Sequence, residues 1–150
     1  MSDEKTVEKI YGKILKRVEN RLGKSRTNTS QLAHFGRHTL GNEFTGVFPI
    51  DKIRPCMLNS YSPYAILNLD DSNSKGSHWI AVARRSDGKF VIYDSFGRQN
   101  ERIVPSLMYF DLVSTDDDSE QCFTEDNCGQ RSLAWLIYAQ IYGLDSAMKI

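Results

Sequence analysis

Apolar and polar residues alternate along this chain with two different periods. Between Asp3 and Leu22 the apolar residues recur every three or four positions, with charged residues between them: Val7, Ile10, Tyr11, Ile14, Leu15, Val18 and Leu22. This spacing places them on one face of a helix, so the segment is predicted to be an amphipathic helix. A second, shorter helix is predicted from Ser30 to about Leu40, with Thr29 or Ser30 as its N-cap.

The middle of the chain is typical of β-strands. After a loop-rich connection with short extended pieces, three apolar runs predict strands at Tyr64–Leu69, His78–Arg84 and Lys89–Asp94. The last two are joined by RSDGK, which predicts a hairpin with Gly88 in the left-handed position of a three-residue loop. Further on, NERIVPSLMYFDLV predicts one or two helical turns, and SEQCFT predicts a short strand. Apolar spacing then predicts a last helix over Asn127–Gly143, where the glycine ends it.

Composition and charge narrow the class of protein. The 150 residues predict one domain, and a chain with 40% apolar and 25% charged residues is ordinary for a globular protein. The net charge is zero, so charge does not indicate a nucleic-acid partner, and we interpret the basic segment 1–30 as a solvated helix face. The N-terminal segment is too charged for a signal peptide, and no apolar run is long enough to cross a membrane. We therefore expect a reducing compartment, in which Cys56, Cys122 and Cys128 are buried or reactive thiols.

Cys128 stands at the start of the last predicted helix. With Asn127 as N-cap, Gln130 falls at the third helical position and predicts a capping-box-like pair. Backbone N–H groups and the positive end of the helix dipole would favour the thiolate and lower the pKa of Cys128. Gly129 would leave the approach to the sulfur open. The alternative is a buried cysteine that happens to begin a helix.

A candidate base and its orienting acid come from the predicted hairpin. His78 begins a strand, whereas the other two histidines lie in a polar segment. A three-residue loop pairs Arg85 with Lys89, and therefore Ile80 with Asp94. Asp94 then lies diagonally across from His78 on the same face, within reach of its imidazole. A cysteine and a histidine with a third group that holds the ring form a catalytic set for acyl transfer.

The remaining requirement is a donor for the oxyanion of a tetrahedral intermediate. The side-chain amide of Gln121 is a candidate, together with the backbone N–H of Cys128. Sequence alone does not select Gln121 over Gln130 or Gln99.

Taken together, these motifs resemble a known family. The order SHWIAV, then VIYDSFG, then QCFTEDNCG with an apolar helix behind it is similar to the adenovirus maturation protease (adenain) family, which includes the adenain-like proteases of Polinton elements and of virophages such as mavirus. The segment HFGRHTLGNEFTGVFPIDKI is also similar to the part that precedes the histidine strand in those enzymes. The resemblance spans roughly Thr27 to Gly143.

The resemblance implies a fold and four site residues. Cys128 would be the nucleophile, His78 the base and Asp94 the acid that orients it, while Gln121 and the N–H of Cys128 would form the oxyanion hole. The implied fold is α+β: a central, mainly antiparallel sheet that carries the histidine and the aspartate, packed on a helix that starts at the cysteine. A single cysteine protease domain would span 1–150, with an N-terminal helix and linker at 1–26 and a catalytic core at 27–143.

The resemblance also implies an activity. Members of the family cleave capsid and other structural precursor proteins next to small residues, often after Gly-Gly or Gly-X-Gly. For this chain we expect no cofactor and no metal. The protein would be located in the virion and in the virus factory of the host cell. Its partner would be a precursor protein that it cleaves. The long C-terminal helical region of the adenovirus enzyme has no counterpart here, so its activation by a peptide and by DNA is not carried over.

Other functions stay open. SUMO and ubiquitin-like deconjugases share the same kind of motifs, but the separation of Gln121 from Cys128 is one residue longer here and Asn127 replaces their aspartate. An acetyltransferase on the same scaffold is more remote. A non-catalytic binding protein would be expected to have lost one of the catalytic residues.

The remaining chemistry-bearing residues receive structural interpretations. A metal site is not predicted, because the only pair at ligand spacing, His34 and His38, has no third ligand beside it. Four further residues are interpreted as packing residues: Trp79, Trp135, Cys56 and Cys122.

Overall fold

A four-stranded sheet organises the fold. The computed structural model describes residues 4–69, 78–95, 107–113 and 127–150. Along the chain lie the helices and strands α1 (Glu4–Leu22), α2 (Thr29–Leu40), β1 (Phe44–Pro49), β2 (Tyr64–Asn68), β3 (Trp79–Arg84), β4 (Phe90–Tyr93), α3 (Cys128–Tyr142) and α4 (Leu144–Ala147), with 3-10 turns at Gly41–Glu43 and Pro55–Met57. The strands lie in the order β1-β2-β3-β4, with β1 and β2 parallel and the other two pairs antiparallel. The α+β class is confirmed, with a mixed sheet.

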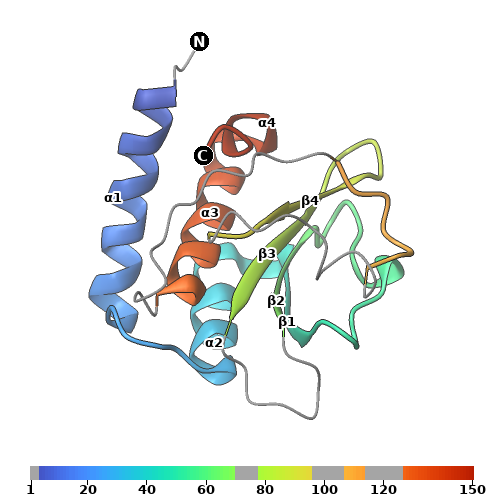
Figure 1. Cartoon of the computed structure of the whole chain (residues 1–150), viewed down its shortest axis with the longest axis horizontal. Helices are drawn as coiled ribbons and strands as arrows, with labels where there is room; N and C mark the ends of the chain where they lie inside the picture. The colour runs from blue at the N-terminus through green and yellow to red at the C-terminus, as the bar shows by residue number, and fades with distance from the viewer. Residues whose placement is uncertain (1–3, 70–77, 96–106, 114–126) are drawn as a thin grey trace.

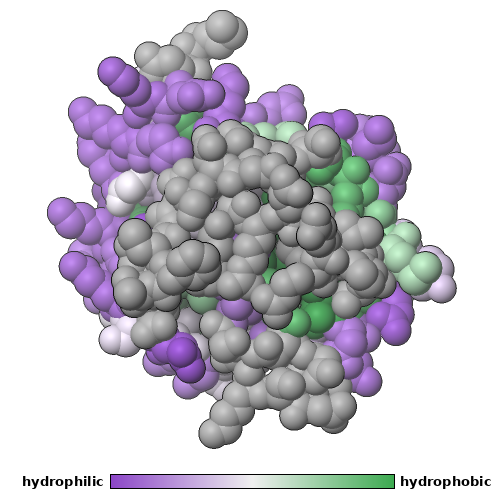
Figure 2. Space-filling view, in the orientation of Figure 1, coloured by the Kyte–Doolittle hydropathy of each residue, from purple (hydrophilic) through white to green (hydrophobic). Residues whose placement is uncertain are grey.

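One face of the sheet packs against helices and the other against connecting segments. One face, which includes Trp79, Ala81 and Tyr93, packs against α1, α2 and α3. The other face, which includes Ile80 and Ile92, packs against the segments 50–58 and 107–112. Figure 1 shows the three long helices on one side of the sheet and the connecting segments on the other. In the same orientation, Figure 2 shows mainly hydrophilic residues on the side where α1 lies.

The two N-terminal helices follow the predicted pattern, with one correction. The apolar stripe of α1 is buried, as its spacing predicts. The N-cap of α2 is Asn28, not Thr29 or Ser30. The Asn28 side chain accepts a hydrogen bond from the backbone N–H of Gln31 at 2.8 Å, and the Gln31 side chain accepts one from Asn28 at 3.0 Å. This reciprocal pair satisfies two N–H groups, which neither alternative cap could do at those positions.

The β3–β4 hairpin has the predicted register. The backbone N–H of Arg85 donates to the carbonyl of Lys89 at 2.7 Å, which makes these two the last paired residues before the loop. Further along the strands, Ala81 pairs with Tyr93. Gly88 has a φ of +87°, the left-handed conformation that the loop requires. The same register places Asp94 opposite Ile80.

Two predicted segments beyond the hairpin are only partly described. Residues 107–110 form a turn, in which the N–H of Phe110 donates to Leu107, and Leu112 then bridges Phe90. No helix is present in the described part, 107–113, of the predicted helical turns. The predicted strand SEQCFT lies outside the described residues. The end of α3 at Gly143, with a φ of +95°, is confirmed.

Candidate active site

The start of α3 and the start of β3 meet at the Cys128 thiol. Cys128 is the first residue of α3, and only 4% of it is exposed. Its Sγ accepts a hydrogen bond from the backbone N–H of Trp79 at 3.4 Å. A second contact joins the same elements one turn later, where the Ser132 hydroxyl donates to the Trp79 carbonyl at 3.2 Å. The thiol is therefore held against the backbone that directly follows His78.

His78 and Asp94 form a buried pair at the adjoining ends of β3 and β4. His78 Nε2 lies 2.7 Å from Asp94 Oδ1, and both side chains are almost fully buried. This contact agrees with the diagonal placement predicted from the hairpin register. Because Asp94 engages Nε2, proton exchange with a thiol has to use the other ring nitrogen, Nδ1, which is also buried. The aspartate thus fixes both the orientation and the tautomer of the imidazole.

The electrostatics of Cys128 differ from the expectation. Burial raises the pKa of the Cys128 thiol, and the carboxylate of Asp94 adds to this effect. The backbone N–H groups of Trp79, Gly129 and Cys128 act in the opposite direction, as predicted for a helix N-terminus, but they do not outweigh burial. The net direction is therefore the reverse of the predicted one: the pKa of Cys128 is raised, because burial outweighs the backbone N–H groups.

The first turn of α3 is tied to the end of α1 rather than capped by its own side chains. Asn127 makes no capping hydrogen bond; its amide donates to Glu19 Oε2 at 3.2 Å. The buried Gln130 amide donates to the carbonyls of Gly23 at 2.8 Å and Ser25 at 2.7 Å. The predicted capping box is therefore wrong. Both N–H bonds of the Gln130 amide are used, which excludes it as an oxyanion donor in this conformation.

Gly129 has a different role from the predicted one. It is buried, and a Cβ added to it would clash with Thr27 Oγ1 and lie 3.1 Å from Leu32 Cδ1. The missing side chain therefore lets Thr27 of the α1–α2 connection and Leu32 of α2 lie close to α3, and it does not open an approach to the sulfur. In the sequence, the signal for this contact is the Cys-Gly pair at the start of a helix, where glycine is otherwise unfavourable.

Tyr11 of α1 is a neighbour of the site that sequence reasoning missed. Its hydroxyl lies 2.9 Å from the hydroxyl of Tyr93, the residue before Asp94, and donates to the carbonyl of Arg131 at 3.4 Å. Tyr93 in turn stacks on Trp135 at a centroid distance of 5.4 Å. A tyrosine on the apolar stripe of an amphipathic helix is a weak signal for a buried polar contact of this kind.

The other predicted residues have mixed outcomes. Trp79 and Trp135 are buried core residues, as predicted. Cys56 is exposed, so its interpretation as a packing residue is wrong; it lies in a 3-10 turn after Pro55, outside both apolar clusters. Gln121 and Cys122 lie outside the described residues.

The described parts of the chain contain neither a cluster of potential metal ligands nor a helix that could span a membrane. His34 and His38 are exposed on α2, and no group of three or more potential metal ligands is found among the described residues. None of the helices that the structure describes is long and apolar enough to span a bilayer.

Comparisons with known proteins do not assign a family. No protein-family model matches the sequence, and no curated protein matches it. What the chain does is therefore inferred from the side chains that its fold brings together.

Proposed function

We propose that this chain is a cysteine endopeptidase in which Cys128 is the nucleophile, His78 the general base and Asp94 the group that orients the base. The observation that carries the proposal is the meeting of three elements. The His78 ring is held by Asp94 at 2.7 Å, and the Cys128 sulfur is held at 3.4 Å by the N–H that follows His78. A nucleophile, a base and an orienting acid within one buried cluster are the parts that acyl transfer requires.

The reaction then proceeds in two halves. The Cys128 thiol passes its proton to Nδ1 of His78 while Sγ bonds to the scissile carbonyl carbon, which places a negative charge on the carbonyl oxygen. His78 returns the proton to the leaving amine, the C–N bond breaks, and a thioester remains. A water then gives a proton to His78 and attacks the thioester; the C–S bond breaks, and the thiol regains its proton.

The oxyanion donors are a further part of the proposal. The backbone N–H of Cys128 at the start of α3 is one donor. The resemblance to adenain-like enzymes supports the amide of Gln121 as the second.

The same resemblance supports a substrate class. We expect capsid or other virion precursor proteins to be cleaved next to small residues, at sites of the Gly-Gly or Gly-X-Gly type, in the virion or the virus factory. A deconjugase of Gly-Gly-tailed modifiers is the nearest alternative, because it would use the same catalytic groups.

The test is cleavage of a library of fluorogenic peptides with Gly-Gly and Gly-X-Gly sites by the purified chain. Cys128→Ala is expected to abolish cleavage and His78→Ala to come close to it, while Asp94→Asn lowers kcat by about 10²–10⁴-fold. Gln121→Ala is expected to lower turnover by about 10²–10³-fold. Circular dichroism checks that each variant stays folded.

Cys56→Ala is the matched control, since it removes an exposed thiol and should leave cleavage unchanged. Activity that survives Cys128→Ala, or binding without turnover, would refute the protease. Cleavage of a folded Gly-Gly-tailed modifier, with no cleavage of linear peptides, would favour the deconjugase.

A further inference from the structure

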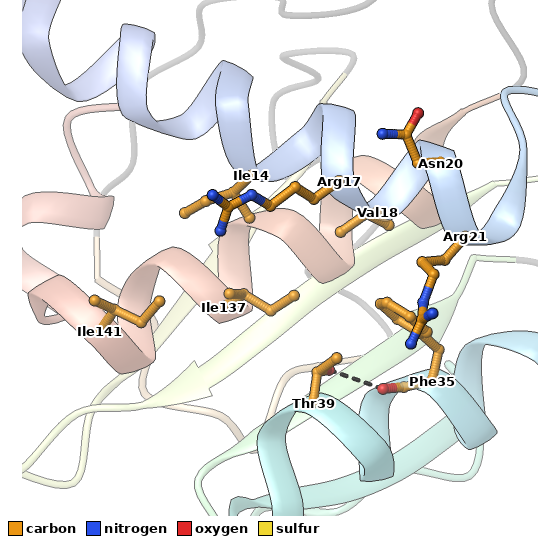
Figure 3. Close-up of a pocket in the computed structure, with 9 residues that line it drawn as sticks. All are labelled: Ile14, Arg17, Val18, Asn20, Arg21, Phe35, Thr39, Ile137 and Ile141. Carbon is orange, nitrogen blue, oxygen red and sulfur yellow. Dashed lines mark hydrogen bonds between the residues drawn. The ribbon is translucent and has the colours of Figure 1, made fainter.

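A groove lies where α1, α2 and α3 meet (Figure 3). Its volume is about 470 Å³, within the range of about 300–1,000 Å³ of pockets that bind ligands. Helix α1 contributes five of its lining residues, α2 two and α3 two: Ile14, Arg17, Val18, Asn20, Arg21, Phe35, Thr39, Ile137 and Ile141. None of them belongs to the proposed catalytic set.

The floor of the groove is apolar and incompletely covered. Ile14, Phe35 and Ile137 are only partly buried by the core, and Ile141 is 59% exposed. The Thr39 hydroxyl, drawn in Figure 3, donates to the Phe35 carbonyl at 2.8 Å, so it is already used inside α2. The floor therefore offers apolar surface to an occupant.

The rim on the α1 side is cationic. Arg17 and Arg21 are both exposed, and neither makes an ion pair within the part of the chain that the structure describes. In Figure 3 the Arg21 side chain extends from α1 toward Phe35 of α2. The two arginines are four residues apart on one helix, which separates them by about 6 Å along its axis.

We propose that this groove binds an acidic amphipathic helix of a partner protein. Apolar side chains spaced at i, i+3, i+4 and i+7 on that helix would pack on the floor. Two carboxylates one helical turn apart would match the spacing of Arg17 and Arg21, because their separation equals one turn of the partner.

The charge of α1 favours this occupant over others. Lys13 and Lys16 on the same helix are also exposed, so the α1 of a second copy would meet a surface of its own sign. A nucleic acid would find its phosphates beside the arginines but an apolar floor beneath its sugar and bases. An acidic helix complements both parts of the groove.

The test uses a fluorescein-labelled helical peptide of about 18 residues, or five turns, with leucines at i, i+3, i+4 and i+7 and glutamates flanking them. Binding to the full chain, measured by fluorescence anisotropy, is expected to weaken about tenfold with Ile141→Glu. The double variant Arg17→Glu/Arg21→Glu is expected to weaken it about 3- to 10-fold, and to bind a peptide with lysines in place of the glutamates more tightly than the wild type does.

Lys13→Glu/Lys16→Glu is the matched control, because it makes the same change of charge on the same helix at two residues that do not line the groove. This control is expected to change the affinity less than twofold. An equal loss for both double variants would overturn the proposal, because it would show general attraction to a basic helix. Binding to phosphatidylserine vesicles that depends on Arg17 and Arg21, with no binding of the peptide, would overturn it in favour of a lipid surface. Since the readout is binding, the result does not depend on protease activity.

Discussion

The close packing of Thr27 and Leu32 around Gly129 predicts that Gly129→Ala destabilises the protein, although alanine is the better helix former. The new methyl group would clash with Thr27 Oγ1 and lie 3.1 and 3.2 Å from the two methyls of Leu32. Thr27 and Leu32 are themselves buried, so neither can move into solvent without cost. Overpacking of this kind costs about 1–3 kcal/mol, and the helix preference for alanine returns at most about 1 kcal/mol. We expect a net loss of about 1–2 kcal/mol.

Urea denaturation provides the assay. Trp79 and Trp135 are buried on the two elements that meet at the site, so their fluorescence reports the loss of this packing. With a slope of about 1–3 kcal/mol per M, the expected loss lowers the midpoint by roughly 0.3–2 M while the slope stays constant.

Gly12→Ala is the matched control. Gly12 lies inside α1, and a Cβ there would meet nothing within 4 Å, so the same substitution should stabilise the protein by up to about 1 kcal/mol. Thr27→Ala removes the hydroxyl that faces the new atom. It should therefore recover part of the Gly129→Ala loss, with a coupling of about 0.5–3 kcal/mol in a double-mutant cycle. Equal stabilisation by Gly129→Ala and Gly12→Ala would refute the close approach of the α1–α2 connection to α3.

Three further predictions follow from the same region. Gln130→Glu replaces a buried donor by a carboxyl group that faces two carbonyls. It should lower the melting temperature more at pH 8 than at pH 5, because burial raises the pKa of the new carboxyl and the folded protein loses stability as that carboxyl ionises. Equal shifts of the melting temperature at both pH values would contradict this. Iodoacetamide at pH 7 should alkylate the exposed Cys56 before the buried Cys128, as followed by mass spectrometry. Faster alkylation of Cys128 would show that an ion pair with His78 outweighs the effect of burial on the thiol. The pKa of Cys128 is raised in the folded state, so the wild type should lose stability relative to Cys128→Ser as the pH rises above about 8.5, where the unfolded thiol ionises. A difference in unfolding free energy between the two proteins that stays constant from pH 7 to 10 would refute this.

The contact between His78 and Asp94 was predictable because its geometry is local. A short hairpin fixes its own register, and the register alone brings Asp94 to His78. Gly88 marks the loop, and the apolar runs on either side mark the strands. The placement of Cys128 at a helix start is local in the same sense.

The surroundings of Cys128 were not predictable, because they depend on contacts between distant parts of the chain. Glutamine at the third position of a helix suggests a capping box, yet Gln130 bonds to carbonyls more than a hundred residues away. The net direction of the thiol pKa depends on burial, and spacing along a sequence does not measure burial. Cys56 is a second example, because the sequence predicted a packing residue and the structure exposes it.

The anchoring of α3 to the α1–α2 connection has a consequence for the order of folding. Gln130 and Gly23 are 107 positions apart, and Asn127 and Glu19 are 108 apart, so these bonds close loops that span most of the chain. Loops of this length close late and slowly, after the local hairpin. Cys128 should therefore reach its final position last, and a local opening that detaches α1 should release the first turn of α3 while the sheet stays intact. Amide hydrogen exchange is expected to show α1 and the first turn of α3 losing protection from exchange as one cooperative unit.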